Sequence, residues 1–125
     1  MLLLDADEDC PAELGKRILA RARACIPHVR VSVVLAKREY EAWFIAAAES
    51  LDGHRGLAFD PADTSDAETP RDAKGWLRER MKGGTYGEMT DQPAFSARFD
   101  LRQAFDGSRS FRTLCAEWER KAAAT

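Results

Sequence analysis

Residues 1–9 read MLLLDADED, an unbroken apolar run that passes directly into a group of acidic residues. Such a run is typical of a strand buried on both faces. Residues 29–35, VRVSVVL, are rich in β-branched side chains and predict a second strand. Between them, from Pro11 onward, apolar residues recur at helical spacing, with the proline in the first turn. Strand, helix and strand in this order predict a right-handed βαβ unit with parallel strands.

The βαβ unit brings several charged residues to one edge of the predicted sheet. Asp5 and Asp7 follow the first strand and Lys37 follows the second, so parallel strands place all three at the carboxyl edge. Open α/β sheets bind ligands at this edge. Two carboxylates there can hold Mg²⁺ or Mn²⁺, and a nearby lysine can offset charge on a phosphate. The same acids also fit a solvated turn favoured by a helix N-terminus.

The remainder of the chain is predicted to be helical apart from one acidic loop. Residues 39–51 carry apolar side chains at helical spacing, with Glu39 and Glu41 in the first turn near the same sheet edge. Three shorter helical segments follow the loop, and in the last of them Phe111 and Trp118 lie on an apolar stripe that we expect in the core.

We therefore expect one α/β domain over 1–125 with a small or incomplete parallel sheet of two strands, flanked by helices. Its parts are a βαβα core over 1–51, a loop over 52–70 and a helical carboxyl-terminal part over 71–125.

Composition limits the classes of function. The chain has 19 basic and 21 acidic residues and a net charge of -2, so no overall basic field indicates a nucleic-acid-binding protein. The amino-terminal apolar run is too short for a signal peptide or a membrane span. Three cysteines without a CxxC pair fit neither a disulfide framework nor a cysteine zinc site. We expect a cytoplasmic protein that does not bind membranes.

Several known motifs are tested and set aside. An EF-hand loop starting at Asp5 would need glycine and glutamate where Cys10 and Lys16 stand. A haloacid-dehalogenase-like phosphatase has a threonine or valine at the position of Asp9. No GxxxxGK[ST] motif is present, so any ATPase would be a separate protein. The basic segment around Lys74 fits an ordinary basic helix face with a core tryptophan better than a phosphate-tracking patch.

Segments along nearly the whole chain resemble a bacterial family known as domain of unknown function 4276, which is similar to the Toprim-like domains. The segments are LLLDADEDCPAELG, VSVVLAKREYEAWF, AAAESLDGHRGL, RDAKGWLRERM, DQPAFSARFDL and SRSF, and AKREYEAWF is the most specific of them. The resemblance implies a Toprim-like, Rossmann-like fold and a Mg²⁺-dependent nuclease or phosphodiesterase acting on nucleic acid. It also implies a separately encoded ATPase as a partner, in arrangements suggestive of phage defence.

The resemblance carries over to particular residues. Asp5 and Asp7 match the metal-binding DxD motif, and Lys37 stands where related nucleases have a lysine. Glu41 belongs to the family motif, and its place predicts an additional acid or metal ligand.

The chain resembles the carboxyl-terminal part of such a domain, without the strand that carries the first Toprim glutamate. Glu41, Glu39 or a partner subunit could replace that glutamate. An open sheet usually needs at least three strands or a covered face. The alternative function is therefore a non-catalytic, partial Toprim-like subunit that docks on an ATPase, or on another copy of itself, through an unpaired sheet edge.

Overall fold

The computed structural model describes residues 1–63 and 66–123. The elements are β1 (Leu2–Asp5), α1 (Pro11–Cys25), β2 (Val33–Ala36), α2 (Ala42–Ala46), the 3₁₀ helices η1 (Ala48–Leu51) and η2 (His54–Gly56), α3 (Ala73–Arg80), α4 (Asp91–Ser96), α5 (Leu101–Gly107) and α6 (Arg109–Ala123).

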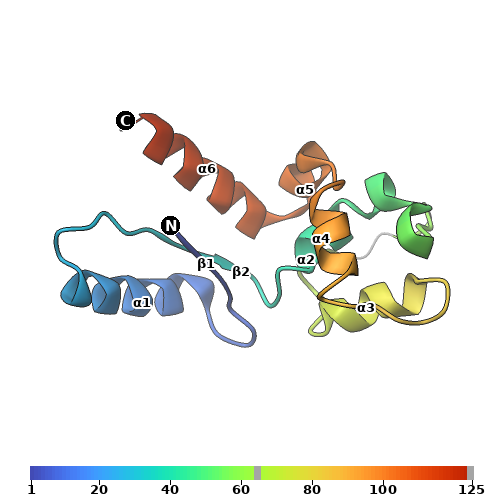
Figure 1. The fold of residues 1–125 in the computed structure, drawn as a ribbon, viewed down its shortest axis with the longest axis horizontal. Helices are drawn as coiled ribbons and strands as arrows, with labels where there is room; N and C mark the ends of the chain where they lie inside the picture. Colours follow the sequence, from blue (N-terminus) through green and yellow to red (C-terminus); the bar gives the residue numbers. More distant parts are fainter. Residues whose placement is uncertain (64–65, 124–125) are drawn as a thin grey trace.

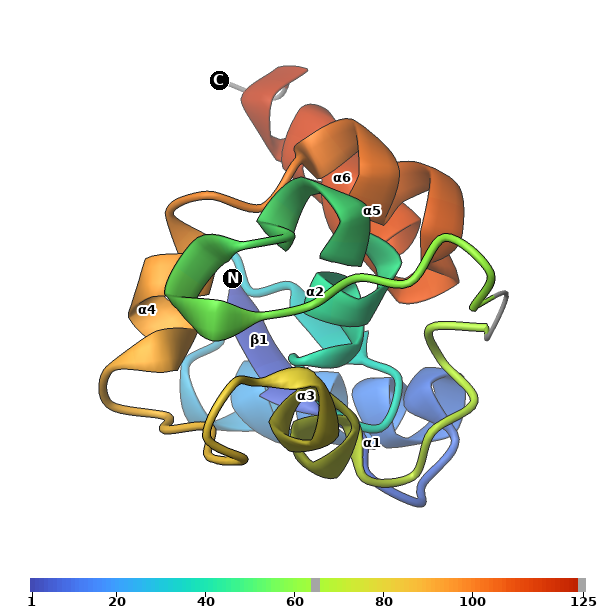
Figure 2. The same ribbon diagram turned by 90° about the vertical axis from the view of Figure 1, so that its right-hand side faces the viewer.

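The two strands lie between α1 and α6. Figure 1 shows α1 below the strands and α6 above them, and Figure 2 shows the same order from a direction turned by 90°. Both helices contact β2. The shorter helices α2 to α5 gather beside this layer, at the end of the strands that leads into α2 (Figure 1).

The predicted order of strand, helix and strand with parallel strands is confirmed. β1 and β2 are parallel, and their register runs from Leu2 opposite Val33 to Asp5 opposite Ala36. β2 is shorter than the predicted 29–35 at its start and extends one residue further, because the four residues of β1 pair only with Val33 to Ala36.

The expectation that β1 is buried on both faces is wrong. Leu2, Leu3 and Leu4 are 41%, 40% and 43% exposed, and α1 contributes no buried residue. Within the described residues β1 pairs with β2 alone, so one of its edges and much of its apolar surface remain uncovered. The small parallel sheet is therefore incomplete in its packing as well as in its strand count.

The core lies instead under the amphipathic segment 39–51. This segment divides into α2 and η1, and Trp43, Phe44 and Leu51 are each at most 1% exposed. The ring of Phe44 meets that of Phe95 edge-on at 5.6 Å between centroids. Large aromatic side chains bury the most apolar area per residue, so these contacts dominate the packing energy.

The three predicted helical segments of the carboxyl-terminal part correspond to four helices, because the second segment divides into α4 and α5 next to Asp100, which caps α5 by accepting a hydrogen bond from the Gln103 amide. Phe111 is buried as expected, whereas Trp118 is 66% exposed and its predicted core position is wrong. Trp118 follows the helical stripe, but the buried residues of α6 are Ser110 and Phe111, both at its start. Among the described residues, no helix is both long and apolar enough to cross a membrane.

Candidate acidic site at the carboxyl edge of the sheet

The carboxyl ends of the two strands are joined beyond the sheet by a series of hydrogen bonds. The Ala6 amide donates to the Ala36 carbonyl at 2.9 Å, and the Asp7 amide donates to the Arg38 carbonyl at 2.8 Å. Asp5, the last residue of β1, accepts a hydrogen bond on Oδ1 from the Tyr40 amide at 2.8 Å. These bonds fix the loop after β1 against the loop after β2, so the carboxyl edge is held by backbone contacts.

Glu41 stands directly after Tyr40 and is completely buried. Its Oε1 accepts hydrogen bonds from the Tyr86 hydroxyl at 3.1 Å and from Gln92 Nε2 at 2.7 Å. Its Oε2 is also buried and has no hydrogen-bond partner within the described part of the chain. An unpartnered oxygen on a buried carboxylate is unfavourable, which makes this atom a candidate ligand for a cation.

The electrostatics connect Asp5 and Glu41. Burial raises the pKa of Asp5 above its ordinary value, and the charges of Glu41 and Asp7 raise it further, against the opposing effects of the Tyr40 hydrogen bond and of Lys74. Burial and the charge of Glu41 also raise the pKa of Tyr86, so its hydroxyl stays protonated and donates. Carboxyl groups that interact in this way often mark functional sites. We call Asp5, Glu41 and the neighbouring Asp7 the acidic edge.

Lys74 of α3 is the lysine associated with the acidic edge. Its Nζ lies 3.2 Å from Oε2 of Glu39 and 3.1 Å from Oε1 of Glu88. Burial alone would lower the pKa of Lys74, but the bonds to these carboxylates outweigh it and raise the pKa above its ordinary value. On this helix face, which the sequence predicts to be an ordinary basic one, Lys74 is partly buried and ion-paired with two carboxylates. Trp76, the predicted core tryptophan, is partly buried against the core and lies under the guanidinium of Arg80.

The other two predicted site residues are exposed. Asp7 is exposed and has a φ of 50°, a left-handed conformation, although its charge still affects Asp5. Lys37 is exposed and lines a separate cavity between α1, β2 and α6. The structure thus brings Asp5 and Glu41 together, leaves Asp7 beside them, and places Lys37 on another surface.

The residues present fit a metal only in part. Over residues 1–63 and 66–123, no three His, Cys, Asp or Glu side chains are arranged to hold an ion. Mg²⁺, however, is commonly held by one or two protein carboxylates, with water and substrate phosphate as its other ligands. Asp5 and Glu41 would supply two such carboxylates.

The chain was compared with models of protein families, with curated proteins and with solved structures, and none matches it. The comparisons therefore assign neither a family nor an activity to the acidic edge. Its chemistry is inferred from its residues and their contacts.

Proposed function

We propose that this chain is a Toprim-like, Mg²⁺- or Mn²⁺-dependent phosphodiesterase or nuclease subunit whose metal site is the acidic edge. The observation that supports the proposal most directly is the buried, unpartnered Oε2 of Glu41 next to Asp5. The resemblance adds Asp7 as the second member of the DxD motif. Nucleic acid as the substrate and a separately encoded ATPase as the partner belong to the same proposal.

Each residue has a defined part in this mechanism. A divalent ion bound there would polarise a phosphate oxygen and lower the pKa of a bound water. The Tyr40 amide orients Asp5, and Tyr86 with Gln92 orients Glu41, so that the two carboxylates are positioned before a ligand arrives. Lys74 takes the electrostatic role expected for Lys37, since its charge acts on both Asp5 and Glu41.

The decisive experiment is a calorimetric titration of Mg²⁺ and of Mn²⁺ into the wild type and four variants. We expect saturable binding that is lost in Asp5→Asn and Glu41→Gln and weakened in Asp7→Asn. Asp9→Asn is the matched control, because Asp9 is an exposed acid of the same turn. Absence of binding to the wild type would contradict the metal site. So would binding to Asp5→Asn and Glu41→Gln with the same affinity as to the wild type.

Activity is tested separately with fluorescent single-stranded DNA and RNA. We expect cleavage that requires Mn²⁺ or Mg²⁺, disappears with EDTA and is absent in Asp5→Asn. Metal binding without cleavage of either substrate would retain the metal site and reject the nuclease assignment for the isolated chain.

A second candidate function is supported by the exposure of β1. An uncovered edge strand with leucines at positions 2 to 4, each about two-fifths exposed, is a template for pairing with another chain. In this alternative the chain is a non-catalytic subunit that pairs with a second copy of itself or with an ATPase.

Light scattering during size-exclusion chromatography distinguishes this alternative. Pairing through β1 predicts a dimer that Leu3→Lys converts to a monomer. Leu101→Lys is the matched control, because Leu101 is 62% exposed and lies on α5, away from β1. A wild type that stays monomeric at all concentrations would contradict self-association.

A further inference from the structure

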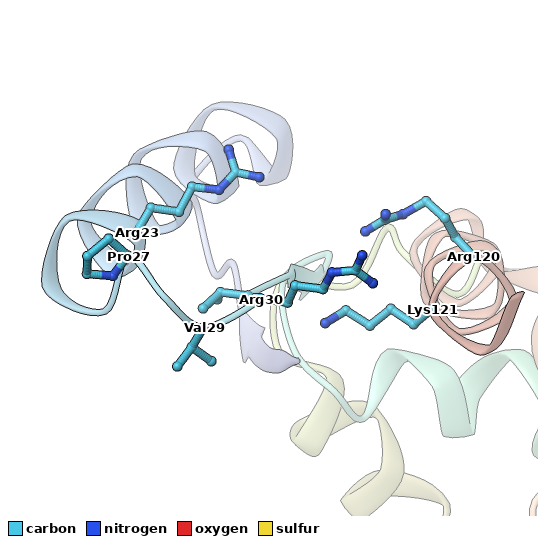
Figure 3. A pocket seen from close by; sticks show the side chains of 7 residues that line it. Arg23, Pro27, Val29, Arg30, Arg120 and Lys121 are labelled. Atoms are coloured by element: carbon cyan, nitrogen blue, oxygen red, sulfur yellow. The ribbon is translucent and has the colours of Figure 1, made fainter. Parts of the chain in front are cut away.

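A cavity of about 470 Å³ lies at the other end of the strands from the acidic edge. It is lined by side chains from α1, from the loop before β2 and from α6, which are Arg23, Pro27, Val29, Arg30, Val31, Arg120 and Lys121. Figure 3 shows Arg23 and Arg120 extending into the space between their two helices, with Arg30 and Lys121 between them. We call it the basic cavity.

The basic cavity carries far more positive than negative charge. Four of its seven lining residues are cations and none is acidic. Arg120 pairs with Glu117, and this hydrogen bond, together with the charge of Lys121, lowers the pKa of Glu117. Within the described residues neither Arg23 nor Arg30 forms an ion pair. Like charges directed into one space repel each other unless an anion balances them.

Helix dipoles account for only part of this arrangement. Arg23 lies in the last turn of α1, and Arg120 and Lys121 lie in the last turn of α6, where cations stabilise a helix. Arg30 belongs to no helix, yet it lines the same space. The helix dipole also does not explain why basic side chains from two different helices line the same cavity.

Size and lining indicate the class of ligand. Cavities for small molecules usually measure about 300–1,000 Å³, and the basic cavity falls in this range. Arginine and lysine bind phosphate through charge-assisted hydrogen bonds. The apolar side chains Pro27, Val29 and Val31 provide a surface for an uncharged part of the ligand.

We propose that the basic cavity binds the adjacent phosphate groups of a small anion, either a nucleoside triphosphate or an inorganic oligophosphate. This site is independent of the metal site proposed above, because its residues precede β2 or lie on α1 and α6. Because the net charge of the chain is -2, the chain does not attract anions in general, and a small phosphorylated ligand would bind through this local basic site.

The test uses ATP and sodium tripolyphosphate as probes in calorimetric titrations of the full chain, with EDTA present to keep the acidic edge free of metal. We expect saturable binding of at least one probe, weakening as salt rises. Arg23→Gln combined with Lys121→Gln should reduce affinity at least about tenfold, since a charge-assisted hydrogen bond contributes more than the free energy of a tenfold change.

The matched control is Arg17→Gln combined with Arg102→Gln, which removes the same charge from residues outside the basic cavity. It should change affinity by less than about twofold, because exposed charges at a distance are screened. Tighter binding of ATP than of tripolyphosphate identifies a nucleotide ligand, and the reverse identifies an inorganic one.

Three results would overturn the proposal. These are no binding of either probe, an equal loss of affinity in the cavity variant and its control, and binding of a single-stranded oligonucleotide in the absence of binding to both small anions. A thermal unfolding scan guards against misfolding, because a variant that unfolds like the wild type yet no longer binds has lost the site alone.

Discussion

Oδ1 of Asp5 accepts a hydrogen bond from the backbone N–H of Tyr40 at 2.8 Å, and this contact places Glu41, the next residue, in the electrostatic field of Asp5. A carboxylate at the end of β1 and one at the start of α2 are thereby positioned together. The arrangement opposes folding in the absence of a cation, because burial and like charge both disfavour ionised Asp5. The first prediction follows from that conflict.

Asp5→Asn should be slightly more stable than the wild type at pH 7 without metal. Asparagine keeps an oxygen for the Tyr40 amide but has no charge to repel Glu41, and the gain is limited to about 0.5 kcal/mol because Asp5 is partly solvated. The raised pKa means that the folded state holds the proton more tightly. The wild type therefore loses stability relative to Asp5→Asn as pH rises through the pKa of Asp5.

Urea unfolding from pH 3 to 7, with and without Mn²⁺, measures this difference. If the acidic edge binds metal, saturating Mn²⁺ should reverse the order, since a ligand at a hundred times its Kd adds about 2.7 kcal/mol to the wild type alone. Asp5→Ala is the control, because it removes the charge and the acceptor together and should be less stable than either protein. If Asp5→Asn were less stable than the wild type at every pH, the proposed repulsion between Asp5 and Glu41 would be contradicted.

The local pattern of the sequence predicted the elements because apolar spacing and β-branched content act over a few residues. This local pattern predicts the βαβ unit, the segment 39–51 and the helices after it. The association of Asp5 with Glu41 was also accessible, since parallel strands bring their carboxyl ends together. Their role as metal ligands stays a prediction.

What the sequence did not reveal depends on contacts between distant segments. The apolar run of β1 favours a buried strand, but how many strands cover it is a property of the whole chain, and here β1 has one partner within the described residues. Lys74 meets Glu39 and Glu88, which stand 35 residues before it and 14 after it, so no local pattern marks the cluster. The Tyr86 hydroxyl donates to Glu41, which stands 45 residues before it.

Tyr86→Phe should destabilise the protein by about 1–3 kcal/mol at pH 7, because it removes one of the two hydrogen bonds to the buried Glu41 carboxylate. The raised pKa of Tyr86 gives the pH dependence. Its stabilising effect is complete below the ordinary tyrosine pKa and is lost as pH rises above it. Urea unfolding at pH 7 and at alkaline pH should show a smaller pH effect in Tyr86→Phe than in the wild type.

Asp91→Asn should destabilise the fold by about 1–2 kcal/mol. Asp91 is 8% exposed and accepts hydrogen bonds from Arg55 and from the Gly87 amide, so the substitution weakens a largely buried charge-assisted contact. Burial alone would raise the pKa of Asp91, but the hydrogen bonds from Arg55 and the Gly87 amide, together with the charge of Arg55, outweigh burial and lower the pKa. The contribution is therefore present above the ordinary aspartate pKa and is lost as pH falls below it.

Chemical unfolding at pH 7 and pH 3 measures the effect of Asp91→Asn, with Asp106→Asn as the control. Asp106 pairs with Arg102 on the surface of α5, where both side chains are more than half exposed, and its loss should change stability by less than about 0.5 kcal/mol. Equal effects of the two substitutions would show that the Arg55 pair has no special energetic role.

Ser110→Ala should cost about 1–3 kcal/mol, because Ser110 connects a buried tryptophan to a carboxylate. Its Oγ accepts a hydrogen bond of 2.9 Å from Trp43 Nε1 and donates one of 2.8 Å to Oε1 of Glu68. Removing the hydroxyl leaves the indole N–H of Trp43, a residue only 1% exposed, without its acceptor. Thr113→Ala on the exposed face of α6 is the matched control and should lie within about 0.5 kcal/mol of the wild type. Urea unfolding followed by circular dichroism compares the two, and a Ser110→Ala protein as stable as Thr113→Ala would mean that water replaces the hydroxyl at Trp43.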